Sequence, residues 1–104
     1  MSVNAGEFTT AVVFKRPERE RTDTGAVRKT YVEAGKALVK LEDKTMAEVL
    51  DDTKVALANV VQLTTYVKRE VDNTYRVAVN GREYEITGIT EVKRRYMIIT
   101  AKLL

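Results

Sequence analysis

The 104-residue sequence predicts a mostly β domain: a small antiparallel β-barrel or sandwich of six to seven strands with one short helix. Three observations support this prediction. Apolar and polar residues alternate in several short runs, turn-forming residues separate the runs, and no regular alternation of strands with helices indicates a parallel sheet. Short antiparallel strands usually close into barrels or sandwiches, which protect their edges. The length corresponds to a single domain, residues 1–104, with residues 1–6 expected to form a flexible N-terminus.

The first half of the chain contains two predicted strands. In residues 8–15, every second side chain is apolar or β-branched, which places these side chains on one face of a strand. Pro17 is expected to end this strand. Residues 18–25 are highly charged and end in a glycine, which predicts a long exposed hairpin loop. The second strand extends from Val27 to Leu41, with Gly35 expected to form a bulge or bend within it.

The second half contains the remaining strands. Alternating runs lie at residues 61–68, 75–79, 84–86 and 96–103. Asn80-Gly81 stands between two of these runs, and this dipeptide favours a type I′ hairpin turn, whose two central residues need positive φ. The basic turn Lys93-Arg94-Arg95 leads to the last strand.

Residues 45–57 follow a different period, which predicts the helix. Apolar residues recur at helical spacing, and Thr45 with Glu48 forms a capping-box pattern at the start. The stripe consists of Met46, Val49, Leu50 and Leu57. It has two interpretations: it caps the barrel as part of the core, or it docks on a neighbouring subunit.

The composition argues against an enzyme. The chain has no histidine, no cysteine and one serine, Ser2, so the commonest general base, the thiolate nucleophile and the main zinc ligands are missing. Asp51-Asp52 with Glu48 matches no calcium-loop spacing. We therefore predict no catalytic residue, no metal and no cofactor. We also expect no signal peptide and no membrane-spanning segment.

Charge is distributed unevenly along the chain. Residues 42–54 carry five acidic and two basic side chains, whereas each flanking part carries eight basic and five acidic ones. This pattern is compatible with head-to-tail self-assembly or with a solvated acidic loop. The acidic residues are Glu42, Asp43, Glu48, Asp51 and Asp52. Two basic clusters consist of Arg16, Arg19 and Arg21, and of Lys93, Arg94 and Arg95. They have two interpretations: contacts to phosphates or partner proteins, or ordinary polar hairpin turns.

Taken in order, these segments resemble the head–tail joining proteins of long-tailed bacteriophages, the head-closure or stopper proteins of the neck. The resemblance covers nearly the whole chain. It includes the polar loop ending in Asp23-Thr24-Gly25, the segment TYVEAGKALV at residues 30–39, and a variable segment at residues 45–58. Its most characteristic part is the hairpin YRVAVNGREYEITGI at residues 75–89, followed by a charged turn and a final apolar strand.

The resemblance implies a structural protein of a phage or prophage that assembles as a ring below the portal or adaptor, closes the DNA channel and connects head to tail. The implied partners are further copies of itself, the portal or adaptor, a tail-completion or tail-tube protein, and packaged DNA bound without sequence specificity. The implied locations are the bacterial cytoplasm during assembly and then the virion neck. Residues 42–58 would project towards the channel and gate it. The alternatives are a tail-completion protein of the same neck and a nucleic-acid-binding small β-barrel.

Overall fold

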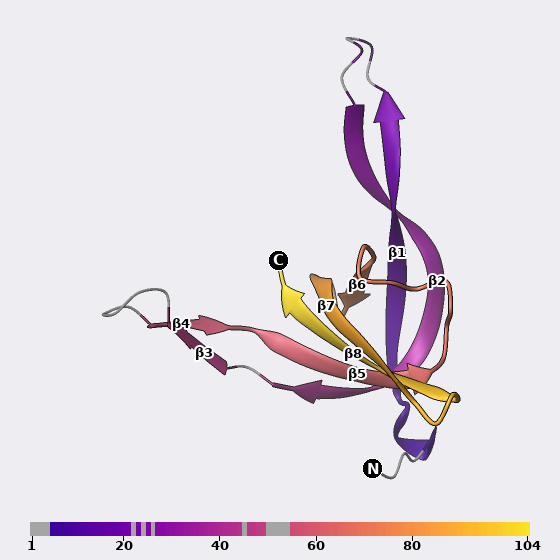
Figure 1. The fold of residues 1–104 in the computed structure, drawn as a ribbon, viewed down its shortest axis with the longest axis vertical. Helices are drawn as coiled ribbons and strands as arrows, with labels where there is room; N and C mark the ends of the chain where they lie inside the picture. Colours follow the sequence, from indigo (N-terminus) through magenta and orange to yellow (C-terminus); the bar gives the residue numbers. More distant parts are fainter. Residues whose placement is uncertain (1–4, 22, 24, 26, 45, 50–54) are drawn as a thin grey trace.

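A computed structural model describes the chain except residues 1–4, 22, 24, 26, 45 and 50–54. Six antiparallel strands form one closed barrel in the order β1-β2-β5-β8-β7-β6, and β6 pairs with β1 to complete the circle (Figure 1). The barrel strands are β1 (Thr10–Arg21), β2 (Val27–Asp43), β5 (Val60–Tyr66), β6 (Arg76–Val79), β7 (Arg82–Val92) and β8 (Tyr96–Leu103). The predicted mostly β class is therefore confirmed. Among the described residues, no helix has the length and apolar character needed to cross a membrane.

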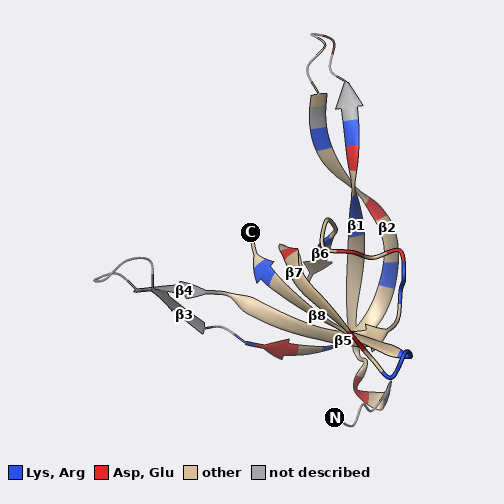
Figure 2. Cartoon of the chain, in the orientation of Figure 1, with Lys and Arg blue, Asp and Glu red and all other residues tan. Residues whose placement is uncertain are grey.

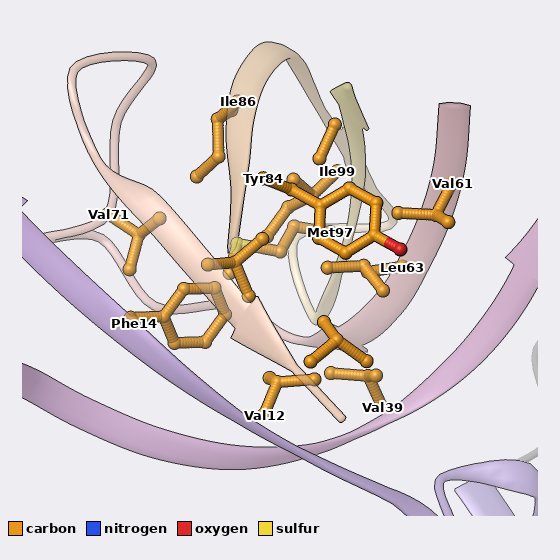
Figure 3. Close-up of a cluster of buried hydrophobic side chains, with 13 residues drawn as sticks. Val12, Phe14, Val39, Val61, Leu63, Val71, Tyr84, Ile86, Met97 and Ile99 are labelled. Atoms are coloured by element: carbon orange, nitrogen blue, oxygen red, sulfur yellow. The ribbon is translucent and has the colours of Figure 1, made fainter. Parts of the chain in front are cut away.

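The barrel interior is filled by side chains that alternate inward along the strands (Figure 3). Phe14 from β1, Leu63 from β5 and Ile99 from β8 are almost completely buried. The alternation predicted for these strands places the same residues in the core. The full set of barrel core residues is Val12, Phe14, Val39, Val61, Leu63, Val71, Val77, Val79, Tyr84, Ile86, Met97, Ile99 and Ala101.

The predicted helix over residues 45–57 is wrong. Its described residues form two antiparallel strands, β3 (Met46–Val49) and β4 (Val55–Ala58). The helical structure in the described part of the chain is one 3-10 turn, η1 (Ala5–Glu7). The β2–β5 ladder continues outward into this hairpin, because the amide of Lys44 donates to the carbonyl of Val60 at 2.7 Å. Extending an existing ladder avoids the unfavourable nucleation of a short helix.

Pro17 does not end the first strand, and the predicted loop at residues 18–25 is shorter than expected. β1 continues to Arg21, and Pro17 pairs with Tyr31 of β2. β6 pairs with β1 only between Val12 and Lys15, so in the described structure the outer part of β1 is bonded on one side. Proline is tolerated there because an edge strand does not need both rows of hydrogen bonds. The outer parts of β1 and β2 project from the barrel as a two-stranded ribbon (Figure 1).

The bulge expected near Gly35 is confirmed. The β1–β2 register shifts between Phe14, opposite Gly35, and Lys15, opposite Glu33. The shift lies where the two strands leave the barrel and continue as the ribbon. Bulges of this kind increase local twist and bend a strand, which is consistent with the curvature of β2 in Figure 1.

The Asn80-Gly81 turn predicts a clear loss of stability for Gly81→Val. Asn80 has φ 51° and Gly81 has φ 79°, as a type I′ turn requires. A β-branched residue is strained at positive φ, so we expect a loss on the order of 1–2 kcal/mol in urea-induced unfolding. Gly88→Ala is the control, because Gly88 has no positive φ and an added Cβ meets open space. Equal stability of Gly81→Val and the original protein would contradict the turn assignment.

Candidate functional site

The acidic segment begins in a network of ion pairs at the end of β2. Glu42 lies 3.4 Å from Lys40 and 3.1 Å from Lys44, and Lys40 also contacts Glu7 at 2.8 Å. Hydrogen bonds from Lys44 and Lys40 hold the pKa of the Glu42 carboxyl below its ordinary value, and those from Lys40 to Glu7 and Glu42 raise the pKa of Lys40. The charge of Glu42 is thus largely compensated by its neighbours. Asp43 ends β2 and Glu48 lies in β3, whereas Asp51 and Asp52 lie outside the described residues.

The β3–β4 hairpin, hereafter the arm, projects from the barrel (Figure 1). Among the described strands, β3 and β4 pair only with each other. Strand alternation and the register divide the arm into two faces. One face carries only apolar residues: Ala47, Val49, Val55 and Leu57. The other carries Met46, Glu48, Ala56 and Ala58.

This register changes the membership of the stripe predicted for docking. Val49 and Leu57 share the apolar face of the arm, whereas Met46 falls on the opposite face. Leu50 lies outside the described residues. An isolated two-stranded hairpin is marginally stable in water, so an arm with one wholly apolar face is suited to contact another surface.

The two basic clusters lie in different parts of the molecule (Figure 2). Arg16 and Arg19 are exposed along β1 where it joins the ribbon, and Arg21 ends the same strand. Lys93, Arg94 and Arg95 are exposed in the turn between β7 and β8. The structure therefore does not bring them together into one basic surface.

The β7–β8 turn places basic side chains at unusual backbone positions. Lys93 has φ 53° and Arg94 has φ 58°, and the amide of Arg95 donates to the carbonyl of Val92 at 3.3 Å. Asn80 and Gly81 in the β6–β7 turn likewise have two successive positive φ values. Residues other than glycine, asparagine and aspartate are uncommon at positive φ.

An apolar groove of roughly 430 Å³, which the sequence did not predict, lies between β2 and the chain that follows β5. Phe8 and Tyr66 meet edge to face with ring centroids 5.4 Å apart, and Tyr96 stacks on Tyr66 at the same separation. Leu38 and Tyr66 remain 55% and 50% exposed. The groove is lined by Phe8, Lys36, Ala37, Leu38, Thr65, Tyr66, Val67 and Lys68. The position of Leu38, an apolar residue on the outward face of its strand, was the available indication in the sequence.

Within the described part of the chain, no group of three or more acidic, histidine or cysteine side chains is arranged to hold a metal ion. The described site is thus one of projecting hairpins, basic turns and an apolar groove. Such features bind other macromolecules through shape, charge and apolar contact.

Comparisons with known proteins find one protein family and several solved structures that resemble this chain. The model of the phage head completion protein family matches residues 3–103. The solution structure of protein SF1141 from Shigella flexneri 2a has a TM-score of 0.70 at 15% identity, covering 97% of this chain and 96% of that one. A chain from the virion of a native gene transfer agent particle has a TM-score of 0.61 at 14% identity, covering 90% and 93%. No curated protein matches the sequence.

The two structural likenesses show a shared fold, and the family match extends over almost the whole chain, including all the strands of the barrel and the arm. The chain belongs to the phage head completion protein family.

Proposed function

We propose that this protein is a structural component of the neck of a phage or prophage particle. In this proposal it assembles as a ring below the portal or adaptor, closes the DNA channel and presents a surface to a tail-completion or tail-tube protein. It works without chemistry of its own, first in the bacterial cytoplasm and then in the virion neck. The observation that carries the proposal is the family match over residues 3–103. The two projecting hairpins support it, because they offer surfaces for neighbours outside a closed barrel.

The acidic segment, residues 42–58, is the part of the chain that we propose to face the channel. Glu48 lies on the arm face opposite the apolar one, by strand alternation. Acidic residues repel DNA phosphates, so a channel lined by them would let DNA slide without sticking.

The direct test is to assemble particles without this chain. We expect heads that fill with DNA, fail to keep it and carry no tails, and we expect added protein to restore both properties. Cryo-EM of complemented particles carrying a labelled chain should show the label as a ring at the neck. Tailed particles that retain DNA in the absence of the chain would contradict the proposal.

In isolation we expect a monomer at micromolar concentration, with the ring forming on a partner template. Four large hydrophobic side chains among the described residues are exposed: Val27, Leu38, Tyr66 and Leu104. Two of them share one small groove, and contacts of this size are weak. Sedimentation velocity measures the state directly, and a stable closed ring at this dilution would contradict the expectation.

The alternative of a nucleic-acid-binding barrel can be tested with a variant that keeps the β7–β8 turn. Lys93→Asn with Arg94→Gly copies the Asn80-Gly81 turn and removes two charges, so we expect unchanged or slightly higher stability. If free DNA binding were the function, this variant would weaken it and lower the salt slope of log K by about 2. We expect instead no DNA binding at physiological salt by either protein in a fluorescence anisotropy titration.

A further inference from the structure

The groove beside β2 has the properties of a docking site for an extended segment. At residues 36–38 β2 pairs with β1 on one side, and among the described residues no strand pairs with its other side, which faces the groove. There the carbonyl of Leu38 accepts a hydrogen bond from the Thr65 hydroxyl at 2.9 Å instead of from a strand amide. A free strand edge beside an apolar groove is the arrangement in which a further strand can add to a sheet.

The groove has an apolar floor that is already ordered. Phe8 is buried beneath Tyr66 and contacts both Tyr66 and Tyr96, with ring centroids 5.4 and 5.9 Å away. At the rim of the groove, Leu38 is slightly more than half exposed and Tyr66 is half exposed. Covering these side chains would bury apolar surface without reorganising the barrel, which favours binding of an apolar segment.

The arm and the groove lie at opposite ends of the same pair of strands. β2 and β5 pair from Lys40 with Thr64 to Asp43 with Val61. The groove begins at Leu38 and Thr65, beyond one end of this ladder, whereas the arm continues from its other end. The arm therefore extends from the end of the ladder opposite to the groove of its own chain, and an arm that enters such a groove must come from another copy.

The two surfaces are complementary. The arm has an apolar face formed by Ala47, Val49, Val55 and Leu57, and the groove floor is apolar. The groove is bordered by the basic residues Lys36 and Lys68, and the segment that contains the arm has five acidic and two basic residues between positions 42 and 54. Lys36 meets Glu33 at 3.7 Å in an exposed pair, which holds it only weakly. Opposite charge of this kind steers association and fixes its orientation.

We infer that the arm of one copy docks, apolar face inward, in the groove between β2 and the end of β5 of the next copy. This contact joins two different surfaces, so it repeats from copy to copy and closes into a ring when the rotation per subunit allows. The inference rests on the proposed ring and names the contact that holds it together. It leaves the face with Glu48 turned away from the neighbour, where the proposed channel lies.

Cross-linking tests this contact without background, because the chain has no cysteine. One protein carries Leu38→Cys in the groove and a second, distinguishable by mass, carries Leu57→Cys on the arm. Under mild oxidation at high micromolar concentration, the mixture should give mostly the mixed dimer. A chain with both substitutions should give a ladder of longer oligomers. Arg82→Cys replaces Leu38→Cys as the control, since Arg82 is exposed and does not line the groove.

The mixed dimer should exceed the control pair by about tenfold, and Lys36→Glu with Lys68→Glu should lower its yield towards the control. Adding Asp51→Lys and Asp52→Lys to the arm chain should restore it. A yield equal to the control, or a preference for dimers of Leu57→Cys with itself, would overturn the inference. The proposed neck location is judged separately by cryo-EM. If a labelled ring is seen at the neck but the cross-link does not form, only the docking contact is refuted. If the cross-link forms but no ring is seen at the neck, the docking contact is supported and the proposed neck location is refuted.

Discussion

Truncating Phe14 to alanine is expected to destabilise the barrel by about 3–5 kcal/mol. Phe14 is 1% exposed and lies in β1, the strand through which the barrel closes. It stands opposite Gly35 of β2 and Val77 of β6, so its ring fills the space at the junction of three strands. The loss is a large part of the stability of a domain of this size.

Urea-induced unfolding followed by circular dichroism measures this effect. Val13→Ala is the matched control, because Val13 is the next residue of the same strand, pairs with the same two strands and is only partly buried. It should cost less than about 1.5 kcal/mol, as the loss of apolar contact at a partly buried position does. A loss for Phe14→Ala no larger than for Val13→Ala would mean that β1 does not bring Phe14 into the barrel core.

The sequence predicted the parts of the fold that depend on local pattern. Alternation identified the strands that supply Val12, Phe14 and Leu63 to the core, because inward and outward residues differ in polarity at period 2. The Asn80-Gly81 turn was predictable because its residues are specific for positive φ. The order of strands around the barrel is set by pairing between segments far apart in the chain, which no local pattern records.

The helix prediction for the arm was wrong because the spacing of its apolar residues fits both a helix and a strand. Met46, Val49 and Leu57 recur at helical spacing, yet Val49 and Leu57 also fall on one face of a hairpin in the observed register. In a short segment, the neighbouring ladder decides between these structures, and the ladder is a tertiary feature. The same reason explains the extension of β1 through Pro17, which depends on the absence of a strand on its outer side in the described structure.

The candidate site was predicted only in its charged parts. Arg16, Arg19 and Lys93 to Arg95 are exposed as expected, but they lie in separate places. The groove was not predictable, because Phe8, Tyr66 and Tyr96 come from three distant segments. The roles of the basic residues as partner or phosphate contacts stay predictions.

Replacing residues 45–58 with a short glycine-containing turn is expected to leave the barrel folded and to abolish its function. β3 and β4 pair only with each other among the described strands, so the barrel ladder does not depend on them. The backbone bond from the amide of Lys44 to Val60 and that from Leu103 to Asn59 lie outside the deleted part, so the end of the barrel remains closed. We therefore expect a change in unfolding free energy within about 1 kcal/mol, because surface segments outside the core contribute little.

Particles assembled with the shortened protein should nevertheless lose their DNA, because the deletion removes the arm that we propose to join neighbouring subunits and to face the channel. Retention of DNA, measured as nuclease-protected DNA per particle, should fall to the level of particles that lack the protein.

Hydrogen exchange in the isolated subunit provides the physical control. Amides of β3 and β4 should exchange faster than those of β5. Among the described strands, these two pair with no other, and such a hairpin opens locally at low free energy. Arm amides as slow as those of β5, or a deletion that unfolds the domain, would instead make the arm part of the core, and DNA retention by the shortened protein would remove its role at the channel.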